Sequence, residues 1–178
     1  MGRVSLSGPI LSQAFEIRRA DADDAEAIAA AHRDSIRAIG PQFYPPELVD
    51  LWGAGVTPQL YVRAMEGGEA FFIAVGRVDG EPMVLGFSSH HVDDAQDGIS
   101  VYVRGSAARR GIGTALLRLA ESHALAHGAT SIEIQASLAG VAFYAANGFD
   151  EIGPIEVILS SGGTIPCVFM RKALSAPA

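Results

Sequence analysis

The sequence predicts a mixed α/β (α+β) fold, with one sheet and helices on its faces, formed by residues 15–174 as a single domain. The chain of 178 residues is 49% hydrophobic and 19% charged, which is typical of a globular protein with one full core. Segments of alternating apolar residues lie between segments of helical spacing, in the order βααα-βββ-α-β-α-ββ, with no repeat or dividing linker. Residues 1–14 and 175–178 are expected to be flexible ends.

Each expected element follows from a local pattern of apolar and turn residues. Asp21 and Asp24 indicate the N-cap of the first helix, and Gly40-Pro41 ends it. Asp79-Gly80 indicates a hairpin turn. The expected strands are 15–20, 70–77, 82–91, 98–105, 131–137, 151–160 and 164–173. The expected helices are 21–39, 44–52, 57–65, 112–127 and 140–147, and an Asp-rich loop is expected at 93–97.

Composition and charge exclude several classes of protein. The net charge is −7, and the acidic residues are concentrated before residue 100, which argues against a nucleic-acid partner. No apolar run approaches the roughly 18 residues that a membrane span needs, and Gly8-Pro9 interrupts any signal peptide. Cys167 is the single cysteine, so no internal disulfide can form, and a cytoplasmic location is expected. Its β-rich surroundings predict a buried, apolar role.

The segment "ARRGIGTALL" (108–117) has the features of a phosphate site at the start of a helix. The first turn of a helix leaves N–H groups unpaired, and glycines let an anion approach them closely. The residues expected to take part are Arg109, Arg110, Gly111, Ile112, Gly113 and Thr114. The P-loop and dinucleotide-binding motifs are both missing. A helix start with two solvated arginines is the alternative.

A second segment adds to this one. After the strand at 131–137 comes "GVAFYAANGF" (140–149), in which Phe143-Tyr144 precede Gly148-Phe149. With "VYVRGSAARRGIGTALL", the segment "ASLAGVAFYAANGF" resembles the two signature segments of the GNAT superfamily, the acetyl-CoA-dependent N-acetyltransferases. The order of strands and helices is similar to the family's from residue 15 to residue 174.

The resemblance implies a place for acetyl-CoA and no metal. The pyrophosphate would lie on the backbone N–H groups of residues 109–114, and the pantetheine arm would pair with Val101 and Val103. The strands 99–103 and 131–137 would diverge and leave a V-shaped gap. Tyr144 matches the family's tyrosine and would protonate the leaving thiolate; packing of its helix against the sheet is the alternative role.

Two positions depart from the family's pattern. Ala108 stands where the first segment usually opens with Gln or Arg, so one side-chain contact is missing there. Ser137 and Ala139 stand at the common positions of an asparagine that helps to hold the pantetheine. The hydroxyl of Ser137 is the candidate to replace that contact.

The acceptor amine must lose a proton before it can attack, so a base is expected. The family often places a carboxylate on the strand that matches 97–103, and Asp97 is the nearest candidate. His90 and His91 end the preceding strand, and one of the two must face the cleft. We take His90 as the candidate base or member of a water chain, with two surface histidines as the alternative. Their adjacency argues against a metal site.

Other side chains are left with two interpretations. Glu133 faces either the acceptor or the opposite side of the sheet, and His32 lies on the apolar stripe of the first helix, as core histidines do. In the segment 36–65, where the family's acceptor specificity varies, the aromatic residues either line an acceptor pocket or pack the short helices together. They are Phe43, Tyr44 and Trp52.

The leading functional hypothesis is transfer of the acetyl group of acetyl-CoA to a primary amine of a small molecule or peptide, by direct attack in a ternary complex. A non-catalytic module that binds an acyl-CoA or a small ligand is the alternative. An enzyme of nucleotide phosphates is disfavoured, because the lysine and the magnesium-binding carboxylates are missing. The apolar strands at 151–160 and 164–173 suit either a homodimer interface or a buried hairpin.

Overall fold

The computed structural model describes residues 14–175, which form a seven-stranded sheet in the order β1-β2-β3-β4-β5-β7-β6. The strands are β1 (Glu16–Arg19), β2 (Ala70–Val78), β3 (Glu81–Asp93), β4 (Gln96–Val103), β5 (Ser131–Ser137), β6 (Asp150–Ile158) and β7 (Thr164–Ala173). The helices are α1 (Ala25–Ile39), α2 (Pro46–Ala54), α3 (Pro58–Glu66), α4 (Ile112–Ala126) and α5 (Val141–Ala146), with short 3-10 turns at Ala22–Asp24, Gly40–Gln42 and Gly105–Ala107. The expected mixed fold is confirmed. The expectation of flexible ends falls outside the described residues, apart from residues 14 and 175.

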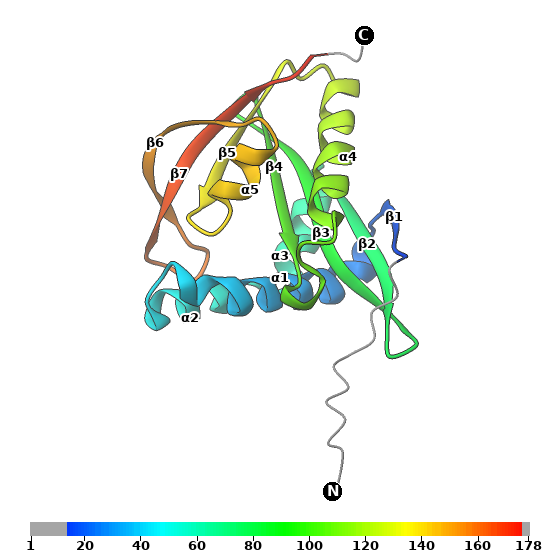
Figure 1. Ribbon diagram of the computed structural model, residues 1–178. Helices are drawn as coiled ribbons and strands as arrows, with labels where there is room; N and C mark the ends of the chain where they lie inside the picture. Colours follow the sequence, from blue (N-terminus) through cyan, green and yellow to red (C-terminus); the bar gives the residue numbers. More distant parts are fainter. Residues whose placement is uncertain (1–13, 176–178) are drawn as a thin grey trace, which may run out of the picture.

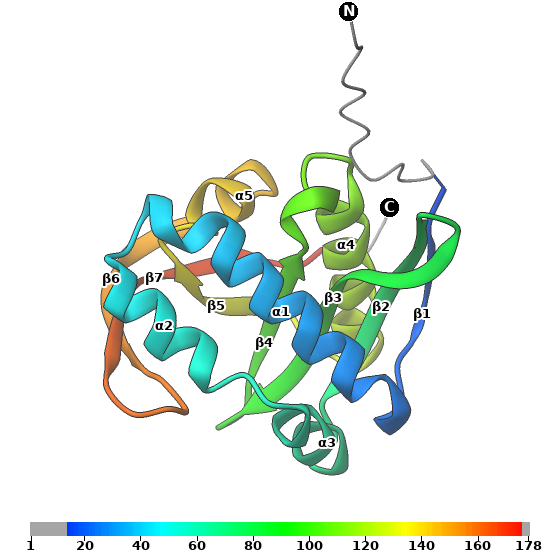
Figure 2. The same cartoon turned by 90° about the horizontal axis from the view of Figure 1, so that it is seen from below.

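Two layers of helices enclose the sheet. Helices α1, α2 and α3 cover one face, with α1 lying across the strands, while α4 packs on the opposite face (Figures 1 and 2). Alternation along β2 supplies both layers: Phe72 packs in the cluster that contains α4, and Phe71 and Ile73 pack in the cluster that contains α1. We refer to these two sides as the α4 face and the α1 face. No helix within residues 14–175 is long and apolar enough to cross a membrane.

The strands β4 and β5 meet at one point and then separate. Their parallel pairing is confined to Gly98 and Glu133, whereas β5 pairs with β7 along its whole length. Figure 1 shows β4 and β5 close together at one end and apart at the other, with α5 beside the gap. The V-shaped gap that the resemblance implied is therefore present, and the edge of β4 facing it has no partner strand beyond Gly98 in the described part of the chain.

A bulge in β3 reverses the direction of the side chains that follow it. Val75 of β2 pairs with Val84, but Ala74 pairs with Gly86, so Leu85 is an extra residue on β3. Val84 packs on the α1 face, and Phe87, three residues later, packs there too. Strict alternation would have put Phe87 on the other face. Every side chain of β3 beyond the bulge is exchanged between the two faces.

The connection between β3 and β4 is tighter than the Asp-rich loop expected at 93–97. Strand β3 ends at Asp93 and β4 begins at Gln96, so only Asp94 and Ala95 form the turn. Both residues have positive φ, 46° and 64°, as a two-residue hairpin turn with the twist of the flanking strands requires. The difference matters because Asp97 becomes a strand residue with a fixed direction.

Candidate active site

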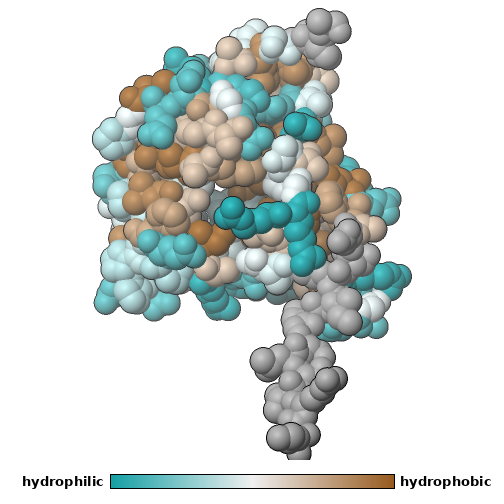
Figure 3. All heavy atoms as spheres, in the orientation of Figure 1, coloured by the Kyte–Doolittle hydropathy of each residue, from teal (hydrophilic) through white to brown (hydrophobic). Residues whose placement is uncertain are grey.

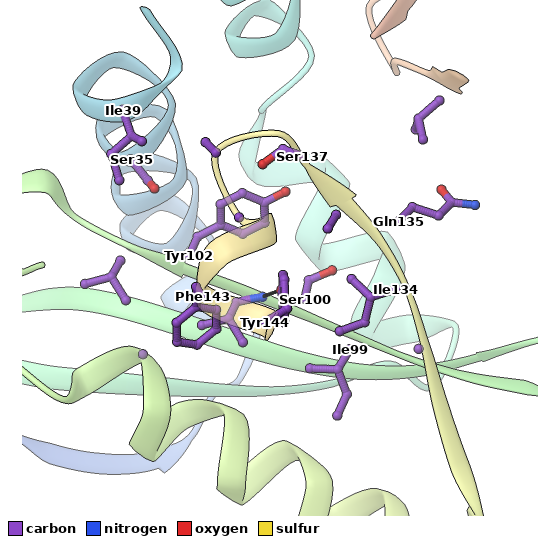
Figure 4. Close-up of a pocket in the computed structure, with 18 of the residues that line it drawn as sticks. Ser35, Ile39, Ile99, Ser100, Tyr102, Ile134, Gln135, Ser137, Phe143 and Tyr144 are labelled. Atoms are coloured by element: carbon purple, nitrogen blue, oxygen red, sulfur yellow. Dashed lines mark hydrogen bonds between the residues drawn. The ribbon is translucent and has the colours of Figure 1, made fainter. Parts of the chain in front are cut away.

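A cavity of about 590 Å³ occupies the gap between β4 and β5. In Figure 3 the corresponding face is hollowed at its centre, with apolar residues around the hollow and a hydrophilic side chain reaching across it. Figure 4 shows side chains from α1, β4, β5 and α5 pointing into this space. The lining includes Val101, Val103, Arg109, Gly111, Gly113, Thr114, Ser137, Ala139 and Tyr144. Most of the residues that the sequence singled out therefore lie around one cavity.

The turn before α4 presents unpaired backbone N–H groups at one end of the cavity. Arg109 and Gly111 both have positive φ, 62° and 79°, and no side chain within residues 14–175 caps the first turn of α4. Successive N–H groups in such a turn form a concave anion site, which the helix dipole reinforces. A Cβ at Gly111 would meet no atom within 4 Å, so the space in front of the turn is open.

Two contacts fix this turn against the rest of the molecule. The Asp34 carboxylate on α1 accepts a hydrogen bond of 2.9 Å from the N–H of Gly105, just after β4. Gly113, in the first turn of α4, lies against the ring of Phe143 on α5, where a Cβ would come within 3.1 Å of a ring carbon. The positions of α1 and α5 therefore set the position of the N–H groups.

The free edge of β4 can accept an extended ligand. The N–H of Val101 points into the gap, where it donates a 3.1 Å hydrogen bond to the hydroxyl of Tyr144. Alternate residues of a strand direct their N–H groups to the same side, so the N–H of Val103 faces the gap as well. An extended chain lying along β4 would find these groups in the positions that an added strand uses.

Tyr144 lies at the centre of the cavity with its hydroxyl against β4 (Figure 4). Its side chain is buried, and that burial raises the pKa of the phenol well above its ordinary value. The hydroxyl oxygen accepts the hydrogen bond from Val101, which leaves its own proton available for a different acceptor. Tyr144 is thus a neutral phenol able to donate a proton inside the cavity.

The bulge at Leu85 decides which of the two adjacent histidines faces the cavity, and it reverses the choice made from the sequence. His91 lines the cavity, whereas His90 points to the α4 face and is buried there. The carboxylate of Glu69, 3.6 Å from His91 Nδ1, raises the pKa of His91. The prediction that His90 is the histidine facing the cleft is therefore wrong in placement.

Asp97 and Glu133 both line the cavity. Asp97 is the second residue of β4, and its Oδ1 lies 2.7 Å from Nε2 of His90. Glu133 lies on β5, where its Oε1 accepts a 3.0 Å hydrogen bond from Nε of Arg171. Because Ile132 and Ile134 on either side of it pack on the α4 face, Glu133, whose direction the sequence left open, is directed to the α1 face, and its charge is balanced by Arg171.

The aromatic residues of the 36–65 segment have different roles. Trp52 lines the cavity together with Tyr102, while Phe43 is exposed and lies outside the lining. The hydroxyl of Tyr44 donates a 2.8 Å hydrogen bond to the carbonyl of Pro166 and accepts a 2.7 Å bond from the N–H of Leu138. Tyr44 therefore connects the segment before α2 to the end of β5 and to β7.

His32 lies in the core, as its position on the apolar stripe predicted. It is buried, its Nδ1 lies 2.6 Å from the hydroxyl of Tyr61, and its ring centroid is 3.7 Å from that of Tyr102. Burial lowers the pKa of His32 to about 3. The side chain is accordingly neutral and forms the wall behind Tyr102.

The charges around the cavity are separated by sign. Arg109 lies at the α4 end, next to the unpaired N–H groups, whereas Asp93, Asp97 and Glu133 lie around the meeting point of β4 and β5. An anion is favoured at the first end and a cation at the second. Between them the lining combines apolar residues with several polar ones, which include Ser35, Ser100, Tyr102, Ser137 and Tyr144.

Comparison with protein families identifies the fold and the class of enzyme. The acetyltransferase (GNAT) family matches residues 30–149, more than half of the chain. The chain therefore belongs to the GNAT family and is an N-acetyltransferase of that family. Comparison with curated proteins found no match.

Solved structures share the fold. A GCN5-related N-acetyltransferase from Rhodopseudomonas palustris is 24% identical with a TM-score of 0.75, covering 97% of this chain and 100% of its own. The PaiA N-acetyltransferase from Thermoplasma acidophilum, solved with coenzyme A, is 19% identical with a TM-score of 0.70, covering 90% of this chain and 99% of its own. The putative acetyltransferase yncA from Salmonella typhimurium, solved with acetyl-CoA, is 20% identical with a TM-score of 0.64, covering 92% of this chain and 96% of its own.

Proposed function

We propose that this chain transfers the acetyl group of acetyl-CoA to a primary amine of a small molecule or peptide, by direct attack within a ternary complex. The observation that carries the proposal is one cavity that favours an anion at the start of α4 and a cation at the other, acidic end, with the neutral phenol of Tyr144 between them. Family membership supports the reaction class.

Acetyl-CoA would lie with its pyrophosphate on the turn 109–114. The N–H groups of Ile112, Gly113 and Thr114 would donate hydrogen bonds to the phosphate oxygens, and the arginine side chains would add charge-assisted hydrogen bonds. The pantetheine would follow the free edge of β4, where Val101 would exchange its bond to Tyr144 for one to the ligand. The hydroxyl of Ser137, which lines the opposite side of the cavity, would face the same arm.

The chemistry requires three proton transfers. Asp97 would take a proton from the ammonium group of the acceptor, breaking an N–H bond and freeing the lone pair on nitrogen. The nitrogen would attack the thioester carbonyl, forming a C–N bond while the C–S bond breaks. Tyr144 would give its proton to the sulfur, and the second proton of the nitrogen would restore the phenol through water. The net products are an amide, free thiol and one released proton.

The acceptor end of the cavity suits a cationic amine with an apolar body. Asp93 and Asp97 would attract the ammonium group, and Trp52 and Tyr102 would provide aromatic surface beside it. The ring of Tyr102 lies against that of His32, with 3.7 Å between the ring centroids, so it forms a rigid wall. We infer that amines with a compact apolar or aromatic group are better acceptors than strongly anionic ones.

The test is release of thiol from acetyl-CoA in the presence of single amines. The panel contains benzylamine, 2-phenylethylamine, a straight-chain diamine and a short peptide with a free N-terminus, with mass detection of the acetylated product. The proposal predicts thiol release that depends on the amine and equals the acetylated product in amount. Binding of acetyl-CoA without release for any primary amine would contradict the proposal and favour a binding module instead.

A further inference from the structure

A continuous row of polar side chains connects the cavity to the outer side of the α4 face. Nε2 of His90 lies 2.7 Å from Oδ1 of Asp97, and Nδ1 of His90 lies 2.9 Å from Nδ1 of His123 on α4. Nε2 of His123 then lies 3.2 Å from Nη1 of Arg19 on β1. Four side chains from four different elements are thus connected by three contacts, and one of them, Asp97, lines the cavity.

The chemistry of the end groups sets the direction of every hydrogen bond in the row. A guanidinium group can only donate, so Nε2 of His123 accepts from Arg19 and the proton of that ring is on Nδ1. His123 therefore donates to Nδ1 of His90. The proton of His90 is then on Nε2, and it is donated to Asp97. The row runs from the positive charge of Arg19 to the negative charge of Asp97, with both imidazoles neutral.

The surroundings hold the two imidazole rings in place. His90 is only 4% exposed, and the ring of Phe72 packs against His123 at 5.4 Å and under the Arg19 guanidinium at 5.3 Å. The His127 ring stacks on His123 at 4.1 Å, with its Nδ1 2.8 Å from the His123 carbonyl. The charged or titratable groups facing the two imidazoles are therefore Arg19, Asp97 and His127. Desolvation and then His127 lower the pKa of His123, which keeps that ring neutral at pH 7.

The row occupies one oxygen of Asp97 and leaves the other without a protein partner among the described residues. Oδ1 receives the hydrogen bond from His90, whereas Oδ2 makes no hydrogen bond or ion pair within residues 14–175. A carboxylate held by one oxygen presents the other in a fixed direction. That direction matters for a base, because proton transfer needs the acceptor oxygen within hydrogen-bond reach of the ammonium group.

We propose that His90 and His123 are positioning residues for acetyl transfer, which act through Asp97 by orienting its carboxylate. The inference rests on the proposed function, in which Asp97 takes the proton of the acceptor amine. It gives His90 a role different from direct contact with the substrate, and it makes His123, on the far side of the sheet, part of the same device. The proton that Asp97 Oδ2 receives forms an O–H bond there and returns to water after turnover.

The first test reads the tautomers by nitrogen-15 NMR of the imidazole rings in the full chain, without ligand. We expect His90 protonated on Nε2 alone and His123 on Nδ1 alone, the less common form of a free imidazole. The Asp97→Asn variant should broaden or shift the His90 signals first. Protonation of His123 on Nε2, or of both nitrogens of either ring at pH 7, would overturn the proposed direction of the row.

The second test is a double-mutant cycle on acetyl transfer to the fastest amine of the panel. We expect His90→Phe to lower kcat about tenfold to a hundredfold, a part of what general-base catalysis contributes, with acetyl-CoA affinity within about threefold. His90→Gln retains an N–H donor toward Asp97 and should recover most of the rate. In a chain that already carries Asp97→Asn, adding His90→Phe should not lower kcat further. Ser122→Ala, on the same helix α4, is the control: its hydroxyl donates to the carbonyl of Arg118 and takes no part in the row, so kcat should be unchanged.

Rescue by the conservative variant separates positioning from a purely structural role. His90→Gln retains the N–H donor toward Asp97 whereas His90→Phe does not, so only His90→Phe should lower kcat, with KM for the amine within about threefold of the unaltered chain. Additive effects in the cycle, or equal losses in kcat for His90→Gln and His90→Phe, would overturn the inference while leaving the acetyltransferase proposal intact. Failure of the unaltered chain to acetylate any amine would instead defeat the proposed function, and this inference with it.

Discussion

Replacing Tyr144 with phenylalanine removes one hydroxyl from the centre of the cavity and tests whether that group protonates the leaving sulfur. The ring packs in the core between Phe143 and Phe149, with centroids 5.1 and 5.5 Å away, and phenylalanine retains both contacts. The loss is then confined to the proton donor and to the hydrogen bond from the Val101 N–H. That N–H would lie unpaired in the unliganded variant, costing about 1–3 kcal/mol of stability.

The expected effect on turnover is much larger than the effect on binding. General-acid catalysis typically contributes about 10²- to 10⁴-fold, or roughly 3–5 kcal/mol of barrier. Because burial keeps the phenol of Tyr144 neutral, we expect a loss in kcat of that size for Tyr144→Phe at pH 7. Acetyl-CoA affinity should change by less than about threefold, since most of the binding contacts are at the turn 109–114.

The assay compares two acetyl thioesters that differ in the basicity of the leaving thiol. With acetyl-CoA the thiolate is basic and needs a proton as it leaves. The thiolate of an aromatic thiol is stable without a proton, so with its acetyl ester the loss in kcat caused by Tyr144→Phe should shrink to about tenfold or less. An equal loss with both esters would refute the assignment of Tyr144 as the acid, and an unchanged kcat with acetyl-CoA would refute it directly.

Three further predictions concern pH and packing. The pKa of His32 is about 3 in the folded chain and about 6.5 in the unfolded chain, so between these pH values the side chain takes up a proton only on unfolding. The contribution of neutral His32 to the free energy of unfolding is therefore fully present above pH 6.5 and is lost as the pH falls toward 3. Urea unfolding at pH 7, 6 and 5 should show that this group lowers the free energy of unfolding by up to about 1.4 kcal/mol per pH unit. In His32→Gln the free energy of unfolding should depend less steeply on pH, and equal dependence in the two chains would contradict the assignment. Tyr44→Phe leaves the Leu138 N–H and the Pro166 carbonyl unpaired and should lower the free energy of unfolding by about 2 kcal/mol, whereas a change under about 0.5 kcal/mol would show that water replaces the hydroxyl. Gly105→Ala places a Cβ 2.4 Å from that of Ala38 and should cost about 1–3 kcal/mol by thermal unfolding, while Gly153→Ala, with no atom within 4 Å, is the matched control; similar midpoints for the two variants would contradict this packing.

The sequence predicts those parts of the site that depend on local structure. The turn before α4 and the segment around Tyr144 each combine turn, helix and glycine signals within a few residues, and both lie where the pattern placed them. The two-residue turn at Asp94-Ala95 was missed because aspartate and alanine are both compatible with a longer loop. Only the pairing of β3 with β4 selects the tight turn.

The parts that were missed depend on long-range packing. Which histidine faces the cavity is decided by one extra residue, Leu85, in β3, and strict alternation from Val84 would have directed His90 to the α1 face. His123 carried no signal of its own, because it meets His90 only when α4 packs across β3. The direction of Glu133 likewise depends on the register between β4 and β5.

The most direct test of the central claim is an isothermal titration of acetyl-CoA into the unaltered chain, Gly111→Asn and Gly111→Asp. Asparagine and aspartate are nearly the same size and both tolerate the positive φ of 79° at this exposed position, so the two variants differ in charge alone. We expect the unaltered chain to bind, and Gly111→Asp to bind at least about tenfold more weakly than Gly111→Asn, a difference of roughly 1.4 kcal/mol. This difference in affinity should become smaller in high salt. Equal affinities of the two variants, or no binding by the unaltered chain, would contradict the placement of the pyrophosphate at the start of α4.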